Sequence, residues 1–245
     1  MATAENYELN YSKLPFEGIL RRYRQRNIQE SLNRHVHKNI LEIGCGEHPI
    51  FQDFDAFDKM VVVEPGDIFY ERAVSLASND ERITIYHGLF ENILDQFKDG
   101  PFDYIIIGGF LHEIDNPDEV LKRIKEVCHT NTIVHSFVPN AKSFHRLLAY
   151  EAGLIQSIYE ESKLDALFGR RTVYDVVTFS ELFELNGFSV IEKGSYFIKP
   201  FTHHQMEKLL SGQIIESSVL DGLNKMSAHF PDNGAEIYIS AKPVL

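Results

Sequence analysis

Two glycines and an acid mark the part of the chain best suited to bind a ligand. The aliphatic run Ile40 to Ile43 is followed by Gly44 and Gly46, which are spaced for a sharp turn, and the next aliphatic run, Met60 to Val63, ends in Glu64. Glycine lets a ligand approach the backbone, and a carboxylate at a strand tip can accept hydrogen bonds from both hydroxyls of a ribose. The pattern therefore predicts an adenosine-type ligand at the edge of a doubly wound sheet.

Several classes of protein are disfavoured by the sequence. A dinucleotide-binding dehydrogenase would need a third glycine at position 49, where the chain has Pro49. A net charge of −12 disfavours a nucleic-acid partner, because phosphate backbones require clustered Lys and Arg. No apolar run approaches the ~20 residues that span a bilayer, and no secretory signal is recognised. Two cysteines, Cys45 and Cys128, are too few for a disulfide framework, so we expect reduced thiols in the cytoplasm.

Alternating strand and helix patterns in the first half would place the glycine turn at a sheet edge. An N-terminal helix is predicted to turn Phe16, Leu20 and Tyr23 inward. The clearest later helix runs from Pro117 to Val127. Strands are predicted at 39–43, 60–64, 83–87, 103–107 and 132–138. This alternation predicts a Rossmann-like, doubly wound α/β fold with helices on both faces of a mostly parallel, seven-stranded sheet.

The second half of the chain lacks this alternation. Residues 141–168 have a mostly helical pattern and no strand, which predicts a helical cap, spanning 141–177, inserted after the fifth strand. A further helix is expected from Thr178 to Asn186, capped by Thr178 or Ser180 and ended by Gly187. The last strands are predicted at 188–192 and 236–241, with weaker helices at 203–211 and 215–226 between them.

Four arginines cluster in the predicted N-terminal helix, at positions 21, 22, 24 and 26. One interpretation is the solvated face of an amphipathic helix. The other is a clamp for phosphate or carboxylate beside the ligand cleft. The sequence leaves both open.

Four motifs in order over residues 39–138 resemble the class I S-adenosylmethionine-dependent methyltransferases. They are Leu41-Glu42-Ile43-Gly44-Cys45-Gly46, the acid Glu64, Asp103-Tyr104-Ile105-Ile106 and Leu111-His112-Glu113-Ile114. The chain departs from the family at His48, where a third glycine is frequent. The resemblance implies a single methyltransferase domain over 1–245, with S-adenosylmethionine as cofactor.

The same resemblance implies a role for each motif. Glu42 would orient the cofactor's ammonium group, and Glu64 would hold its ribose. The glycine turn would contact the methionine half, the turn after the third strand would flank the adenine, and the turn after the fourth would line the sulfonium. The implied cofactor-binding residues are Glu42, Gly44, Cys45, Gly46, Glu64, Pro65, Gly88, Leu89, Phe90, Gly108 and Gly109.

The methyl acceptor is indicated by a second resemblance. Segments 138–146 and 168–174 are similar to methyltransferases that tailor polysaccharides and sugars. This similarity implies a hydroxyl of a sugar, or of a nucleotide-linked sugar, as the small-molecule acceptor. The implied substrate-binding residues are Asn140, His145, Arg170 and Tyr174.

An alcohol is a poor nucleophile at neutral pH, so its methylation is helped by a base within hydrogen-bond reach. His112 is the first candidate, because it follows the fourth strand, and His145 is the second, at the opening turn of the cap. Each is also compatible with a structural role, such as packing or capping. Glu113 could orient His112, whereas His135 alternates on a central strand and fits a core position.

These observations predict an S-adenosylmethionine-dependent O-methyltransferase. Two alternatives stay open: an N- or C-methyltransferase acting on another small molecule, and a protein that binds the cofactor without catalysis. Eleven histidines, including His203 and His204, raise the question of a metal. No ligand spacing typical of a metal site is present, so no metal is predicted.

Overall fold

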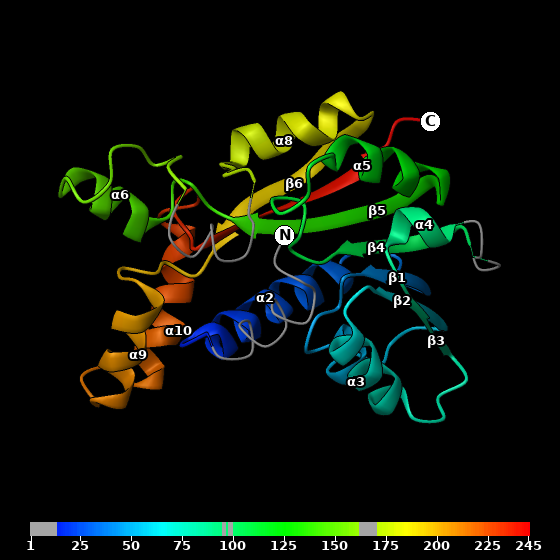
Figure 1. Ribbon diagram of the computed structural model, residues 1–245, viewed down its shortest axis with the longest axis horizontal. Coiled ribbons are helices and arrows are strands. Elements are labelled where there is room, and N and C mark those ends of the chain that lie inside the picture. The colour runs from blue at the N-terminus through cyan, green and yellow to red at the C-terminus, as the bar shows by residue number, and fades with distance from the viewer. Residues whose placement is uncertain (1–13, 95–96, 98–99, 162–170) are drawn as a thin grey trace.

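The computed structural model describes residues 14–94, 97, 100–161 and 171–245, and it contains one seven-stranded sheet (Figure 1). The strands lie in the order β3-β2-β1-β4-β5-β7-β6, and only β7 runs antiparallel to its neighbours. Their bounds are β1 Asn39–Ile43, β2 Lys59–Glu64, β3 Ile83–His87, β4 Phe102–Ile107, β5 Cys128–Pro139, β6 Phe188–Tyr196 and β7 Glu236–Pro243. The predicted Rossmann-like, mostly parallel sheet is confirmed.

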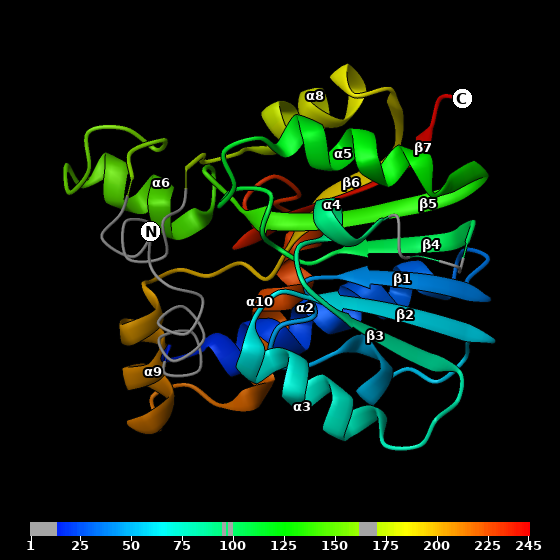
Figure 2. The same ribbon diagram turned by 45° about the vertical axis from the view of Figure 1, so that its right-hand side comes forward.

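Helices cover both faces of this sheet (Figures 1 and 2). One face carries α4 (Phe90–Ile93), α5 (Pro117–Glu126) and α8 (Val176–Leu185). The other carries α2 (Glu17–Leu32) and the short 3-10 helix η1 (Ile50–Gln52), while α3 (Asp67–Ala77) packs beside β3. Beyond the strand tips lie α6 (Phe144–Glu151), α9 (His203–Ser211) and α10 (Ser217–Lys225), which is followed by the 3-10 turn η3 (Met226–Ala228).

Each face of the sheet has its own apolar core, because successive side chains of a strand point to opposite faces. On β1, Leu41 and Ile43 point toward α5 and α8, whereas Ile40 points toward α2. All three are at most 3% exposed. A third apolar cluster joins the first turns of α2 to α9 and α10 through Leu20, Met206 and other side chains. The N-terminal helix is therefore shared between the sheet and the C-terminal helices.

A buried polar chain fixes α2 against the sheet. The Tyr104 hydroxyl donates a hydrogen bond to Ser31 Oγ at 2.7 Å, and His135 Nδ1 lies 3.0 Å from Ser240 Oγ. The His135 ring stacks between Tyr104 and Tyr238. Burial lowers its pKa to about 3, with Arg34 and His35 adding to the effect. His135 is therefore a neutral core residue, as its place on a central strand predicts.

One detail of the predicted helices was wrong. The helix α8 begins at Val176 and is capped by Asp175, which forms a capping box with Thr178. Thr178 and Ser180 lie inside the helix, because the Asp175 carboxylate already accepts the first free backbone N–H groups. In the predicted cap, the described residues 141–161 contain only the eight-residue helix α6. No residue of α6 is buried as a whole, although the Nδ1 atom of His145 is, and α6 projects from the sheet (Figure 1).

The order of the strands determines where a ligand can bind. The chain runs outward from β1 in both directions, to β2 and β3 on one side and to β4 and β5 on the other. Helices that follow β1 and β4 diverge to opposite faces in such a sheet, and a crevice opens at the carboxyl ends of these strands. Gly44, Glu64 and Gly108 follow or end the strands that border this crevice.

We expect Asp175→Ala to destabilise the fold. Asp175 Oδ1 accepts Val177 N at 3.0 Å and Thr178 N at 2.9 Å, and Oδ2 lies 2.7 Å from Lys142 Nζ and 2.8 Å from the Tyr159 hydroxyl. Removing an N-cap costs about 1–2 kcal/mol of unfolding free energy. Thermal unfolding should show a decrease of several degrees in Tm, whereas the exposed control Glu181→Ala on the same helix should leave it unchanged.

The pH dependence of the stability loss in Asp175→Ala separates the loss of the N-cap from a general packing defect. Burial by itself would raise the pKa of Asp175, but the hydrogen bonds from Lys142, Thr178 and Tyr159 outweigh it and hold the pKa well below its ordinary value of 3.8. The charged carboxylate therefore stabilises the fold above pH 3.8, and this contribution is lost as the pH falls further. The stability difference between the wild type and Asp175→Ala should narrow in acid. A difference that does not change with pH would contradict this account.

Candidate functional site

The glycine turn after β1 is held by hydrogen bonds to the neighbouring strand. Gly44 and Gly46 have positive φ angles of 75° and 59°, which favour glycine. Gly44 N donates to Val63 O at 2.8 Å, and Gly46 N donates to Glu64 Oε2 at 2.9 Å. The other carboxylate oxygen, Glu64 Oε1, accepts Gly66 N at 2.9 Å. The two glycines and the acid thus converge at one place.

The end of β4 completes the floor of this crevice. Gly108 N donates to Ile43 O at 2.8 Å, and a Cβ atom at Gly108 would lie 2.0 Å from Gly44 O. At Gly109 a Cβ atom would lie 2.9 Å from the Phe137 ring. Both positions therefore require glycine for close approach of backbone to backbone or ring.

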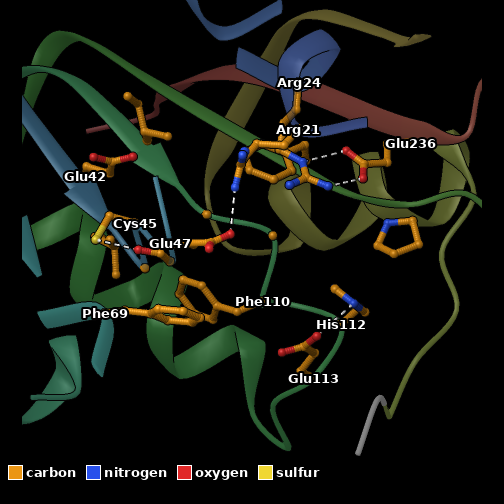
Figure 3. A pocket seen from close by; sticks show the side chains of 18 of the residues that line it. Arg21, Arg24, Glu42, Cys45, Glu47, Phe69, Phe110, His112, Glu113 and Glu236 are labelled. Atoms are coloured by element: carbon orange, nitrogen blue, oxygen red, sulfur yellow. Dashed lines mark hydrogen bonds and ion pairs between the residues drawn. The ribbon is translucent and has the colours of Figure 1, made fainter. Parts of the chain in front are cut away.

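The crevice opens into a cavity of about 740 Å³, which falls within the range for sites that bind small molecules. All the predicted cofactor-binding residues line it, from Glu42 and the glycine turn to Leu89, Phe90 and Gly109. In Figure 3, Glu42 and Cys45 lie on one side of the cavity, and His112 and Glu236 lie on the other. We call the side with Glu42 and Cys45 the acidic end of the cavity, and the side with His112 and Glu236 the far end.

The acidic end contains a carboxylic acid in an unusual state. Glu42 is 5% exposed and accepts Ile50 N at 3.1 and 3.3 Å through its two oxygens. Burial raises its pKa to about 8, although the Ile50 hydrogen bond opposes the shift and the nearby Glu64 adds to it. At neutral pH the empty cavity favours the protonated acid. A cationic ligand would favour the carboxylate and displace the proton.

Cys45 completes this end without offering a nucleophile. Its thiol lies 3.6 Å from Glu64 Oε2 and 3.6 Å from Gly46 O. Burial raises the pKa of the thiol far above its ordinary value, and the adjacent Glu42 and Glu64 carboxylates add to the shift. A thiol in this state is unreactive as a nucleophile.

His112 lies in the loop after β4 and lines the cavity. The residue is 3% exposed, and its Nε2 lies 3.4 Å from Glu113 Oε1, so the adjacent acid does face it (Figure 3). The His112 carbonyl accepts Arg171 N at 2.8 Å and Thr172 N at 3.2 Å. The loop that carries the histidine is thereby joined to the segment that precedes α8.

His145, on the first turn of α6, lines the same cavity. Its Nδ1 is buried and has no hydrogen-bond partner among the described residues. Burial lowers the pKa of the ring well below its ordinary value, and the charges of Lys199, His203 and Arg146 lower it further. The imidazole is therefore neutral, and a neutral imidazole is the form that can accept a proton.

The remaining predicted substrate residues differ in their positions. Asn140 lines the cavity, but its amide nitrogen donates to Asp232 O and Gly234 O at 2.9 and 2.8 Å, and its Oδ1 accepts Lys142 N at 2.9 Å. Tyr174 lies in the core against Phe179 and does not line the cavity, because its strand-like segment turns the ring toward α8. Arg170 lies outside the described residues.

The arginines of α2 fit neither of the two interpretations of the sequence completely, the solvated helix face or the clamp for phosphate or carboxylate. Arg21 and Arg24 do line the cavity, but carboxylates of the same chain pair with them (Figure 3). Arg21 lies 2.7 Å from Glu47, and Arg24 contacts both Glu17 and Glu236. Arg21 and Arg24 therefore connect α2 to the glycine turn and to β7.

The sequence did not reveal several residues of the far end. These are Glu17, Arg146, Lys199, His203 and Glu236, all of which line the cavity. Lys199 is 2% exposed and donates to His203 Nδ1 at 3.0 Å. Lys199 follows β6 in a segment without periodicity, so no local pattern marks it as buried.

Comparison with known proteins decides the family. The profile of a methyltransferase domain matches residues 17–193. The chain is a member of this methyltransferase domain family. No curated protein matches the sequence.

Solved structures with the same fold show what this methyltransferase is similar to. An S-adenosylmethionine-dependent methyltransferase from Mesorhizobium loti has a TM-score of 0.60 and 14% identity, covering 89% of this chain and 96% of that one. The plantazolicin methyltransferase BamL, in complex with a triazolic desmethylPZN analogue and S-adenosylhomocysteine, has a TM-score of 0.53 and 15% identity, with coverages of 99% and 86%. The mycolic acid cyclopropane synthase CmaA1, also complexed with S-adenosylhomocysteine, has a TM-score of 0.55 and 16% identity, with coverages of 89% and 83%.

The methyltransferase uses S-adenosylmethionine, and the residues of the acidic end suit this cofactor. Glu42 faces the cavity where an ammonium group would be stabilised, Glu64 ends β2 as a ribose-binding acid does, and the glycines leave room at the floor. When bound, the cofactor supplies an electrophilic methyl group on a sulfonium. Among the described residues, no group of three or more His, Cys, Asp or Glu could hold a metal ion. No helix in the described part of the chain is long and apolar enough to cross a membrane.

We expect cofactor binding to release protons at Glu42. Because its pKa is about 8 in the empty cavity, S-adenosylhomocysteine should displace about one proton near pH 7, and the affinity should increase as the pH rises toward 8. Calorimetry in buffers of different ionisation enthalpy measures this proton count. Glu42→Gln should bind more weakly and release no proton.

The pH dependence of the free energy of unfolding is the control for Glu42→Gln. The unfolded chain loses the Glu42 proton near pH 4.5, whereas the folded chain keeps it up to about pH 8. The free energy of unfolding of the empty protein therefore falls across this window, and Glu42→Gln should be more stable than the wild type above pH 8. A variant that is less stable at every pH would contradict the proposed state of Glu42.

Gly108→Ala should weaken cofactor binding. The new Cβ atom would overlap Gly44 O at 2.0 Å, so the β4 tip and the glycine turn must separate. We expect S-adenosylhomocysteine to bind at least about tenfold more weakly and Tm to fall, because strained overpacking costs about 1–3 kcal/mol. The control Gly222→Ala on α10, where nothing lies within 4 Å of the new atom, should preserve both. Wild-type binding by Gly108→Ala would show that the floor is not rigid.

Proposed function

We propose that this methyltransferase is an O-methyltransferase acting on a small molecule, with a hydroxyl of a sugar or a nucleotide-linked sugar as the acceptor. The observation that supports it is that His112 and His145 both line the cavity, with His112 on the side away from the acidic end, where an acceptor would lie. O-methylation requires a proton to leave the hydroxyl, and an imidazole within hydrogen-bond reach can accept it.

The polar character of the far end favours a sugar over an apolar acceptor. Sugars bind through many hydrogen bonds, and this end is lined by Glu17, Arg24, Lys199, His203 and Glu236. The pairing of these side chains with one another holds them in fixed positions, so they can discriminate between hydroxyl arrangements. A small apolar pocket would instead favour the N- or C-methylation of another compound.

The protein's own residues would act as follows. Glu42 and Glu64 bind the cofactor, the glycines bring the backbone close to it, and Glu113 orients the His112 ring. His112, as the proposed base, accepts the proton of the acceptor hydroxyl, with His145 as the second candidate for this role. Residues beyond the matched range, such as Lys199 and Glu236, line the same cavity, which supports a single methyltransferase domain over residues 1–245.

The test is His112→Ala, assayed with a panel of nucleotide-linked sugars and other hydroxylated small molecules through the release of S-adenosylhomocysteine. We expect kcat to fall by ~10²–10⁴, the usual contribution of a general base. The affinity for S-adenosylhomocysteine should stay within about twofold, because His112 is not part of the acidic end. The exposed control His204→Ala should have wild-type kcat.

His145→Ala distinguishes the two histidines. A larger loss of kcat in His145→Ala than in His112→Ala would move the base to His145. Full activity in both variants would contradict base catalysis by either histidine and would favour N-methylation, in which an amine already carries a reactive lone pair.

A further inference from the structure

A short segment before α8 connects the two loops from which the candidate bases reach the cavity. We call residues 171–175 the strap. Its first two residues donate backbone N–H groups to His112 O, at 2.8 Å from Arg171 N and at 3.2 Å from Thr172 N. His112 lies in the loop after β4 and lines the cavity. The strap therefore holds this loop by its backbone, at the position of the histidine.

The other end of the strap takes the place of β4 beside the end of β5. The strand β4 pairs with β5 only as far as Ser136, whereas β5 continues to Pro139. Successive N–H groups of an extended chain point to opposite sides. Asn140 N donates toward β7, so Ala141 N points to the side that β4 has left, where Tyr174 O accepts it at 2.7 Å. A parallel bridge between Asn140 and Tyr174 marks the same pairing.

This pairing also holds the loop of the second histidine. Ala141 lies in the turn that leads from β5 into α6, and the first turn of α6 carries His145, which lines the cavity. Ala141 is fully buried, so a loss of the bond to Tyr174 would leave its N–H group without water as a substitute. One segment of the backbone is therefore bonded to both histidine loops.

An ion pair fixes this end of the strap by side chains as well. The Asp175 carboxylate has two separate functions, because its two oxygens have different partners. Oδ1 caps α8, whereas Oδ2 lies 2.7 Å from Lys142 Nζ and 2.8 Å from the Tyr159 hydroxyl. Lys142 follows Ala141 in the turn before α6, and Asp175 is only 3% exposed. The pair therefore joins the strap to the turn that precedes α6.

We propose that Lys142 and Asp175 are positioning residues, which hold His112 and His145 at a fixed separation through the strap. This inference rests on the proposed function, because it concerns the residues that position the proposed base. The two histidine loops begin where β4 and β5 no longer pair, so the sheet itself does not fix one loop against the other. A misplacement of about 1 Å can lower a rate about 10²-fold, so a fixed separation matters for proton transfer.

The acidic end is held in a different way. The hydrogen bonds of Gly44, Gly108 and the Glu64 carboxylate join the ends of β1, β2 and β4 to one another. A loosened strap should therefore impair the transfer step and leave the affinity for the cofactor unchanged. This difference separates a positioning role from a general loss of structure.

The first experiment needs no acceptor and measures amide hydrogen exchange by NMR in the wild type and in Lys142→Met. We expect the N–H groups of Arg171 and Thr172 to lose protection together with that of Ala141, by at least about tenfold. Arg171 and Thr172 lie at the opposite end of the strap from the ion pair, so their response shows that the strap acts as one unit. The exposed control Lys208→Met should leave all three unchanged. Changes confined to Ala141, or no change, would overturn the proposal.

The second experiment compares the kinetics of Lys142→Met and Lys142→Arg, with an acceptor that the wild type methylates. Lys142→Met keeps a long side chain without the charge, and we expect its kcat to fall about tenfold or more. Its affinity for S-adenosylhomocysteine should stay within about twofold. Lys142→Arg keeps a cation beside Asp175 and should restore kcat to within about threefold of the wild type. Wild-type kcat in a folded Lys142→Met would overturn the proposal.

A milder variant covers the case in which Lys142→Met does not fold, as judged by Tm and circular dichroism. Tyr159→Phe removes only the hydroxyl that donates to Asp175 Oδ2, from a side chain that is largely exposed. We expect a smaller loss of kcat in the same direction, with the affinity for S-adenosylhomocysteine preserved. Wild-type kcat in Tyr159→Phe would then count against the positioning role.

Methyl transfer by the wild type keeps the two proposals distinct. If the wild type methylates a hydroxylated acceptor and Lys142→Met does so equally well, the positioning role is refuted and the proposed function stands. If the wild type methylates no such acceptor, the proposed function fails. Joint loss of protection at Ala141, Arg171 and Thr172 would still support the strap as the unit that fixes both histidines.

Discussion

The whole site depends on how the carboxyl ends of β1, β2 and β4 are joined. Gly44 N bonds to Val63 O, Gly108 N bonds to Ile43 O, and the Glu64 carboxylate holds Gly46 N and Gly66 N. These hydrogen bonds extend the sheet ladder by one residue beyond each strand, so three turns are held at fixed distances. Two of these four hydrogen bonds join backbone groups, and the other two are accepted by one buried carboxylate, so little side-chain motion can disturb them. The cavity is therefore preorganised, and the ligand does not have to order its floor.

Most of the fold could be predicted from the sequence, because the sheet strands are short apolar runs separated by helices of clear period. The glycine turn and the two acids could be predicted for a related reason: each feature depends on a few neighbouring residues. The cap of α8 was missed because three polar residues, Asp175, Thr178 and Ser180, offer competing caps, and tertiary contacts to Lys142 and Tyr159 favour the first.

The far end could not be predicted, because its residues are distant in the sequence and belong to weakly patterned segments. Lys199 follows a strand, and His203 opens a helix whose capping box is Thr202 with Gln205. Only the packing of α2 against α9 and α10 brings them beside Glu17. The arginine cluster illustrates the same limit, since the sequence shows four charges but not the acids that meet them. Arg24 is compensated by Glu236, which lies 212 positions further along the chain.

The acidic end of the cavity couples ligand binding to the protonation of Glu42. Glu42 keeps its proton in the empty cavity because burial and Glu64 disfavour a second negative charge there. A cationic ligand removes that obstacle and converts the acidic end into an ion-paired one. Because a proton leaves Glu42 as the cationic group arrives, the net charge at the acidic end does not change when the ion pair forms. The buried acid thus favours a cationic ligand over a neutral one of the same shape, without requiring any movement of the sheet.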